Sequence, residues 1–518
     1  MNRKTRQRIE FGDFQTPFPL ADEICALLHK LGYTPNSILE PTCGRGHFIL
    51  AALKNFDSVS KIIGLDINPA YIESLALQLG KYQTVALYQS DFFDTNWREV
   101  LSVLPDPLLI LGNPPWVTNA ELSTFEGNNL PPKNNFQKYS GFDAITGASN
   151  FDISEWMLLR MFEWVRNRNA IVAMLCKTTV ARKVLLHEWK NNPKSGRARM
   201  FLIDTLSHFG VSVEACLLVY DTCDVGAKIC NVHRTLSPSS KSTRFGYEDG
   251  QLVANIDFYK KWRHLQTGQN DKDFVWRSGI KHDCAKVMEL TRLGNHYRNG
   301  LGERVDIEET FVYPMMKSSD VAKSVPPHRF MLITQKFVGQ ETAFIRTIAP
   351  KTWNYLLEHR DCFERRKSAI YRNNPPFSIF GVGDYSFSNW KVAISGLYKK
   401  IHFVPIGPHD GKPVVLDDTC YFLACPGEEE ARLIATLLNS QPAVEFFSSF
   451  VFWDAKRPVT AKILNKINII ALAKIFQPLR DGEYNILLSK PEQLRLLEQE
   501  GACLVSGAGN TPISEEIQ

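Results

Sequence analysis

The chain has 518 residues, 44% hydrophobic and 22% charged, which is typical of a globular protein with about two to three domains and argues against extensive disorder. No run of about 18 apolar residues is present and no apolar segment follows the basic N-terminus, so we expect a cytoplasmic protein without a membrane span. The 11 cysteines are scattered without a Cys-x-x-Cys pair, which predicts neither a disulfide framework nor a metal site, and the net charge of +5 permits a polyanionic partner without requiring one.

The first 220 residues or so alternate short apolar runs with amphipathic ones. A helix is expected over 18–32, followed by a strand, a loop and a helix over 37–56. Further strands and helices are expected within the segments 61–80, 85–94, 108–116, 156–165, 170–178, 201–209 and 213–221. Such regular alternation predicts a doubly wound, mostly parallel sheet that binds its ligands beyond the carboxyl ends of the strands.

The loop between the first strand and its helix, EPTCGRGHF at 40–48, contains two glycines. Gly44 and Gly46 would let the backbone approach a ligand closely, and the helix that starts near Gly46 presents free N–H groups. Ile49 occupies the third glycine position of a dinucleotide-binding fingerprint, and no Gly-Lys-Ser/Thr follows as in a P-loop. The expected ligand is therefore a single nucleoside.

Two acidic residues follow at the ends of the next strands. Asp66 lies about 20 residues after the glycines, where an acidic side chain accepts hydrogen bonds from ribose hydroxyls. Asp91 ends the third strand and is followed by Phe92, whose apolar face could hold an adenine ring. Each acidic residue alone is better explained as a helix cap or a surface carboxylate. Together with the glycines they outline an adenosine-shaped site.

The strand LLILG, 108–112, ends in four residues of a different kind, Asn113, Pro114, Pro115 and Trp116. Consecutive prolines supply no backbone N–H, so they end the hydrogen-bond ladder and stiffen the chain that follows. The Asn113 side-chain oxygen and the backbone carbonyls are acceptors, and Trp116 offers a flat apolar face. The segment predicts a receptor for a flat group that carries an amine; the alternative is a plain loop with a surface tryptophan.

The alternation stops after Tyr220. The segment 233–246 is rich in Ser, Lys and Pro and is predicted to be an interdomain linker. Beyond it, basic residues are interleaved with aromatics, as in DFYKKWRH and ERRKSAIYRNNPPFSIFG, which suits a nucleic-acid surface and also an ordinary solvated one. The end of the chain, 499–518, is expected to be a loose tail.

The order QTPFPLADEICALL, EPTCGRGHF, GLDINP, QSDFFD, LGNPPW resembles that of class I S-adenosylmethionine-dependent methyltransferases. More narrowly, it resembles the gamma-class N6-adenine DNA methyltransferases of bacterial restriction-modification systems, over about the first 220 residues. In that family a Thr-Pro segment closes over the methionine part of the cofactor. The resemblance therefore implies an S-adenosyl-L-methionine site formed by Thr16, Pro17, Glu40, Gly44, Gly46, Asp66, Asp91 and Phe92, with no metal.

The resemblance also implies a reaction. An adenine would be flipped out of the DNA duplex, and Asn113 and Pro114 would accept hydrogen bonds from its amine. Trp116 would stack on the base, Phe209 is a candidate for the opposite face, and the methyl group would transfer directly. The family more often has Tyr or Phe in place of Trp116, and a small residue in place of Arg45.

We therefore expect an α/β protein, with a Rossmann-like class I methyltransferase sheet and a C-terminal α+β DNA target-recognition domain that resembles, less specifically, those of the family. The expected domains are a catalytic domain (1–232), a linker (233–246), a target-recognition domain (247–498) and a tail (499–518). Double-stranded DNA is the expected partner; a separately encoded restriction endonuclease would be another, since no fused nuclease is expected from the few residues before Thr16. The alternatives are a related methyltransferase acting on an RNA base or a protein glutamine amide, and a catalytically inactive DNA-specificity protein.

Overall fold

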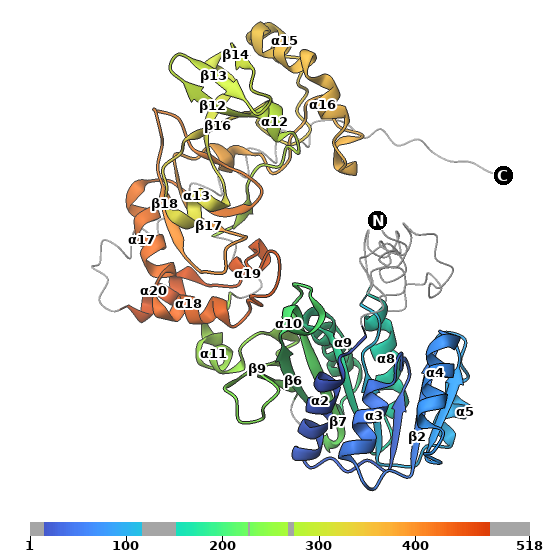
Figure 1. Cartoon of the computed structure of the whole chain (residues 1–518). Coiled ribbons are helices and arrows are strands. Elements are labelled where there is room, and N and C mark those ends of the chain that lie inside the picture. The colour runs from blue at the N-terminus through green and yellow to red at the C-terminus, as the bar shows by residue number, and fades with distance from the viewer. Residues whose placement is uncertain (1–14, 117–151, 226–227, 268–273, 477–518) are drawn as a thin grey trace, which may run out of the picture. The chain divides into compact units, whose positions relative to one another are not determined.

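The computed structural model describes residues 15–116, 152–225, 228–267 and 274–476. The chain divides into two compact units, Met1–Ile256 and Asp257–Gln518 (Figure 1). In the described ranges, no helix is both long and apolar enough to cross a membrane. The predicted tail, 499–518, lies outside the described residues.

The first unit is an α/β fold in which strands and helices alternate. Its elements are α2 (Phe18–Lys30), β1 (Ser37–Glu40), α3 (His47–Asn55), β2 (Lys61–Asp66), α4 (Pro69–Leu79), β3 (Val85–Gln89), α5 (Trp97–Ser102), β4 (Leu108–Gly112), α8 (Ile153–Val165), β5 (Ala170–Lys177), α9 (Thr178–Asn191), β6 (Gly196–Ile203), α10 (Thr205–Phe209), β7 (Ala215–Val225), β8 (Ile229–His233), β9 (Ser242–Glu248) and β10 (Gln251–Val253).

The ten strands form one sheet in the order β10-β9-β8-β6-β7-β5-β4-β1-β2-β3. Strands β1 to β5 pair in parallel, whereas β7 runs antiparallel to both β5 and β6. The strand order changes direction between β1 and β4, and in such sheets the crevice at this point, outside the carboxyl ends, receives the ligand. The structure thus confirms the doubly wound, mostly parallel sheet.

Apolar side chains on one face of the sheet form a hydrophobic core with the helices. Ile38, Ile62, Leu109, Ile171 and Leu217 come from five strands and share one buried cluster with residues of α2, α3 and α4. The strand β4 is buried along its whole length, as expected of a parallel strand that is covered on both faces. This packing holds the carboxyl ends of β1, β2 and β4 in fixed positions.

The predicted linker is wrong in position. The segment 233–246 contains most of β9, which pairs antiparallel with β8, and the first unit continues to Ile256. The reason is Phe245, which is buried and packs on Trp189 of α9 with ring centroids 5.6 Å apart. Phe245 is the one large apolar residue of the segment 242–246, which was not enough to mark a strand, although it anchors β9 against α9.

The second unit combines short helices with two sheets, which confirms its α+β character. The four-stranded sheet has the order β11-β20-β17-β18, and the six-stranded sheet has the order β14-β13-β12-β16-β15-β19. The elements are α11 (Ile256–Trp262), β11 (Arg277–Ser278), α12 (Ala285–Met288), β12 (Glu289–Leu293), β13 (His296–Asn299), β14 (Arg304–Val305), β15 (Val312–Met316), α13 (Ser318–Lys323), β16 (Arg329–Leu332), α14 (Ile345–Ile348), α15 (Pro350–Glu358), α16 (Arg360–Glu364), β17 (Trp390–Ser395), β18 (Phe403–Ile406), β19 (Val415–Leu416), β20 (Cys420–Cys425), α17 (Glu428–Leu438), α18 (Gln441–Ser448), α19 (Ala461–Leu464) and α20 (Ile469–Ile475).

Candidate active site

The glycine loop has the backbone conformation that its sequence predicts. Gly44 and Gly46 have φ values of +49° and +70°, and Gly46 is the N-cap of α3. A Cβ on Gly46 would lie 2.5 Å from the side chain of Leu75, so both the conformation and the space require glycine. The Arg45 side chain is exposed, so the loop accommodates it where the family more often has a small residue.

Asp66 ties the end of β2 to this loop. One carboxylate oxygen accepts a hydrogen bond from the Gly44 N–H at 2.7 Å, and the other accepts one from the Asn68 N–H at 2.9 Å. These two bonds hold the carboxylate between the glycine loop and the residues that follow β2. The structure brings Asp66 and the glycine loop together; the role of Asp66 toward a ribose stays a prediction.

The Thr-Pro segment lies against the same loop. Pro17 is the N-cap of α2, and the buried Thr16 bonds through its carbonyl oxygen to the His47 ring at 2.6 Å. The side-chain oxygen of Gln15 accepts a hydrogen bond from the Arg45 N–H at 3.0 Å. Residues about 30 positions apart in sequence are therefore adjacent at the start of α3.

Glu40 is a buried acid at the end of β1, with 3% of its surface exposed. Its Oε2 atom is buried and has no hydrogen-bond partner among the described residues. Burial and the nearby Asp66 carboxylate raise the pKa of Glu40, and a backbone hydrogen bond from Ile49 acts in the opposite direction. A buried acceptor without a donor is costly, so this position suits a ligand that supplies one.

Asp91 and Phe92 follow β3 as expected, but the surroundings of Phe92 were not predicted. The Asp91 carboxylate accepts a hydrogen bond from the Phe93 N–H at 2.8 Å. The buried Phe92 belongs to an aromatic cluster whose other members are Phe93, Trp97, Trp156 and Trp164. Sequence reasoning overlooked the two tryptophans of α8, although their spacing of eight residues places them near one face of a helix.

The Asn113–Trp116 segment leaves β4 at the carboxyl edge, next to β1. Trp116 is 6% exposed, and its indole N–H donates a hydrogen bond to the Leu175 carbonyl at 3.4 Å. Its ring contacts Phe209 edge to face, with centroids 5.5 Å apart and planes inclined at 63°. The structure thus brings together the two aromatics that sequence reasoning singled out. Because they touch directly, a base can stack between them only after the rings separate.

Lys177 is a residue of this site that sequence reasoning missed. It is the last residue of β5, and its Nζ atom donates hydrogen bonds to the Trp116 carbonyl at 3.3 Å and to the Asp152 carboxylate at 2.7 Å. Asp152 in turn caps α8 by accepting from the Ser154 N–H and hydroxyl. The sequence feature that could have indicated Lys177 is its position as a charged residue at the end of a buried strand next to β4.

The sheet order, the glycine loop tied to Asp66 and the Asn-Pro-Pro-aromatic end of β4 define a class I methyltransferase. The chain is 45% identical over 481 residues to the type II methyltransferase M.NspV of Nostoc sp., covering 91% of this chain and 98% of that protein. The chain therefore belongs to the family of type II methyltransferases.

Other similarities are local or structural. The chain is 35% identical over 114 residues to the type II methyltransferase M.CvrRI of Paramecium bursaria Chlorella virus XZ-6E, covering 22% of this chain and 26% of that protein. The type IIL restriction-modification enzyme MmeI, solved in complex with DNA, has the same fold, with a TM-score of 0.53, 13% identity, and coverage of 97% of this chain and 73% of MmeI. No protein-family sequence profile matches the chain.

Proposed function

We propose that this protein is a site-specific DNA methyltransferase, which transfers a methyl group from S-adenosyl-L-methionine to the exocyclic N6 amine of an adenine in double-stranded DNA. The observation that carries the proposal is the position of Asn113 and Trp116. They follow β4, whose residue Ile110 pairs with Leu39 at the end of β1, immediately before Glu40 and the glycine loop. The proposed amine receptor and nucleoside site would therefore open at neighbouring strand ends.

The described residues fit the methyl donor. The buried Oε2 of Glu40, which has no hydrogen-bond partner among the described residues, suits the ammonium group of the methionine part. The Thr-Pro segment would close over that part from the start of α3, where the Thr16 carbonyl bonds to His47. Gly44 and Gly46 allow close approach of the backbone, and Asp66 and Asp91 supply acceptors for the ribose hydroxyls and the adenine amine. When bound, the sulfonium group supplies an electrophilic methyl.

The target amine needs orientation more than acid–base chemistry. Its lone pair is delocalised into the base, and two acceptors on its N–H groups would turn that pair toward the methyl group. The Asn113 side-chain oxygen and the Pro114 carbonyl would fill this role, and the proton can leave after methyl transfer. Trp116 would stack on the flipped base, a contact worth about 1–3 kcal/mol, with Phe209 at its other face.

Lys177 acts as a positioning residue in this scheme. It does not touch the base; it holds the Trp116 carbonyl and thereby the end of the segment that does. The second unit, with its basic and aromatic clusters, would recognise the target sequence, and a separate restriction endonuclease would cut DNA that lacks the methyl group.

The test is to express the chain and map N6-methyladenine in the DNA of the host cell. Methylation of adenine at one recurring sequence is the expected result; methylation of RNA or protein in place of DNA would overturn the proposal. The Asn113→Ala variant should lose methyl transfer by on the order of a hundredfold or more and keep its affinity for S-adenosyl-L-methionine, measured by calorimetry. Near-normal turnover by this variant would contradict the mechanism.

A further inference from the structure

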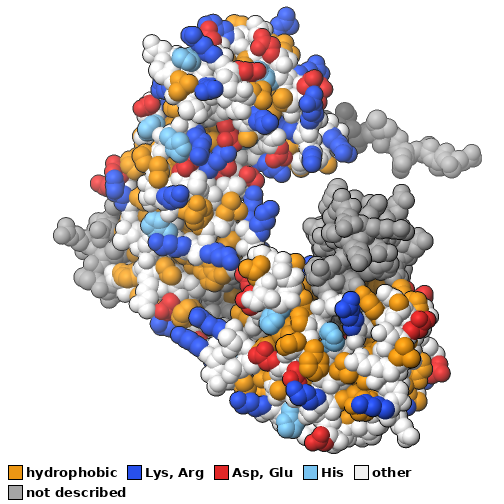
Figure 2. Space-filling view, in the orientation of Figure 1, with side chains coloured by type: hydrophobic (Ala, Val, Ile, Leu, Met, Phe, Trp, Pro, Cys, Tyr) orange, Lys and Arg blue, Asp and Glu red, His pale blue; other side chains and the backbone are white. Residues whose placement is uncertain are grey.

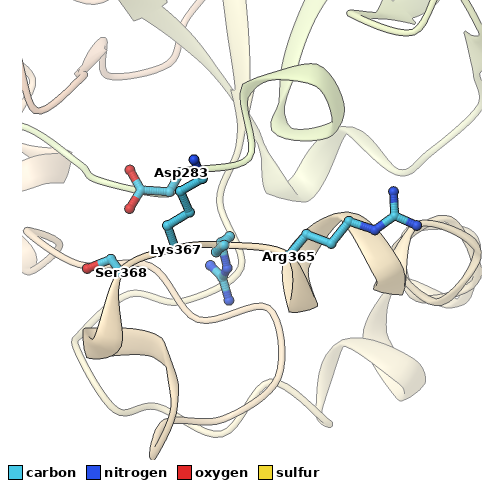
Figure 3. Close-up of a pocket in the computed structure, with 5 residues that line it drawn as sticks. Asp283, Arg365, Lys367 and Ser368 are labelled. Carbon is cyan, nitrogen blue, oxygen red and sulfur yellow. The ribbon is translucent and has the colours of Figure 1, made fainter. Parts of the chain in front are cut away.

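A hollow in the second unit is lined mostly by cations. It has a volume of about 520 Å³ and is formed by Asp283, Arg365, Arg366, Lys367 and Ser368, from the turn before α12 and the chain that follows α16. Figure 3 shows Lys367 and Asp283 close together, with the Arg365 side chain extending away from them. On the face shown in Figure 2, Lys and Arg side chains are also numerous around α16.

Arg366 gives the hollow a fixed frame. Its guanidinium lies 3.6 Å from the centre of the Tyr371 ring and donates hydrogen bonds to the carbonyls of Phe363, His282 and Ser378. Burial lowers the pKa of Arg366, but a guanidinium remains charged in proteins. This side chain joins three separate segments, so the walls of the hollow are held in place before any ligand arrives.

The remaining cations are available to a partner. The side chain of Arg365 is 80% exposed, and its ion pair with Asp361 is long, at 3.7 Å, which makes it weak in water. Lys367 is exposed as well. The one carboxylate in the lining, Asp283, pairs with Lys281 at 3.4 Å. The lining therefore holds three cations and one partly neutralised anion, and its net positive charge attracts anions.

We propose that this hollow binds a phosphate of the DNA backbone and anchors the second unit on the duplex independently of sequence. The inference rests on the proposed function, which makes DNA the partner. Lysine and arginine supply charge-assisted hydrogen bonds to phosphate oxygens, and the Ser368 hydroxyl can add a neutral one. Residues of the basic and aromatic run thus have two roles. The Tyr371 ring packs on Arg366 and fixes it, whereas the exposed cations Arg365 and Lys367 are open to a phosphate.

The test measures how the affinity for duplex DNA depends on salt. Each phosphate contact contributes about 0.9 to the slope of log K against log salt concentration, so the Arg365→Gln/Lys367→Gln variant should lower the slope by nearly two units. Its affinity at about 0.15 M salt should fall roughly 10- to 30-fold, equally for target and non-target duplexes. The matched control is Arg432→Gln, an exposed helical arginine with an acidic partner four residues away, which should change neither quantity.

A second variant should change the affinity for DNA in the opposite direction. Asp283 has a φ of +51°, a conformation that asparagine tolerates, so Asp283→Asn should fold normally. It removes the repulsive charge and should tighten binding of both duplexes severalfold. An unchanged slope and affinity in the double variant, or weaker binding by Asp283→Asn, would overturn the proposal. Methylation of DNA by the wild-type chain is read separately, so a failure of the proposed function would be recognised as such.

Discussion

Replacing Lys177 with methionine tests whether the hydrogen bond from the end of β5 holds the Asn113–Trp116 segment in the position that methyl transfer requires. The variant keeps the length of the side chain but removes both hydrogen bonds of the ammonium group. Breaking a buried ion pair costs about 3–5 kcal/mol. Because the Lys177 side chain is 21% exposed and the Ser154 bonds to Asp152 remain, we expect a loss of about 2–3 kcal/mol in the free energy of unfolding.

The effect on activity should be larger than the effect on cofactor binding. Without its donor the Trp116 carbonyl is no longer held, and a displacement of about 1 Å near a reacting group costs about a hundredfold in rate. We expect kcat to fall by that amount in a methyl-transfer assay, while the Kd for S-adenosyl-L-methionine stays within about twofold, because the two hydrogen bonds that the substitution removes go to Trp116 and Asp152 and not to the glycine loop or Glu40.

The Lys177→Met/Asp152→Asn double variant separates positioning from stability. It removes the carboxylate that the single variant leaves buried at 8% exposure, and asparagine is as good a helix N-cap as aspartate. Stability should therefore return to within about 1 kcal/mol of the wild type, whereas kcat should remain low. If kcat recovers with stability, or if the single variant keeps full activity, Lys177 does not position the motif.

Three further results are expected. Glu40→Gln should raise the Kd for S-adenosyl-L-methionine about 10- to 100-fold, as the loss of a charged hydrogen bond implies, and an unchanged Kd in calorimetry would exclude the proposed ammonium contact. Gly46→Ala should lower the urea midpoint more than Gly32→Ala, because Gly32 has a similar φ of +87° but open space around its Cβ position. Burial lowers the pKa of Lys391 to about 7, so between about pH 7 and 10 the unfolded state binds a proton that the folded state does not. The free energy of unfolding, relative to that of the Lys391→Met variant, should therefore rise over this pH range by up to about 4 kcal/mol. Denaturant unfolding of both proteins at each pH measures this difference.

Much of the first unit follows from its sequence because parallel strands have strong local signatures. The run LLILG before Asn113 is uniformly apolar, and the glycines of the loop have φ values that other residues avoid. Contacts between distant segments were less visible. Nothing in the local sequence marks Phe245 as the residue that anchors β9 against α9, and Lys177 lies about 60 residues from the carbonyl that it holds.

Contacts with β5, the strand that ends in Lys177, explain why position 116 is a tryptophan. Its indole N–H reaches the Leu175 carbonyl, a bond that Phe cannot form, while Lys177, two residues further along β5, holds the Trp116 backbone. The stiffness of Pro114 and Pro115 alone would fix only the direction in which the segment leaves β4. Two attachments to β5 fix where its aromatic end lies, so the pocket proposed for the base is shaped jointly by both strands.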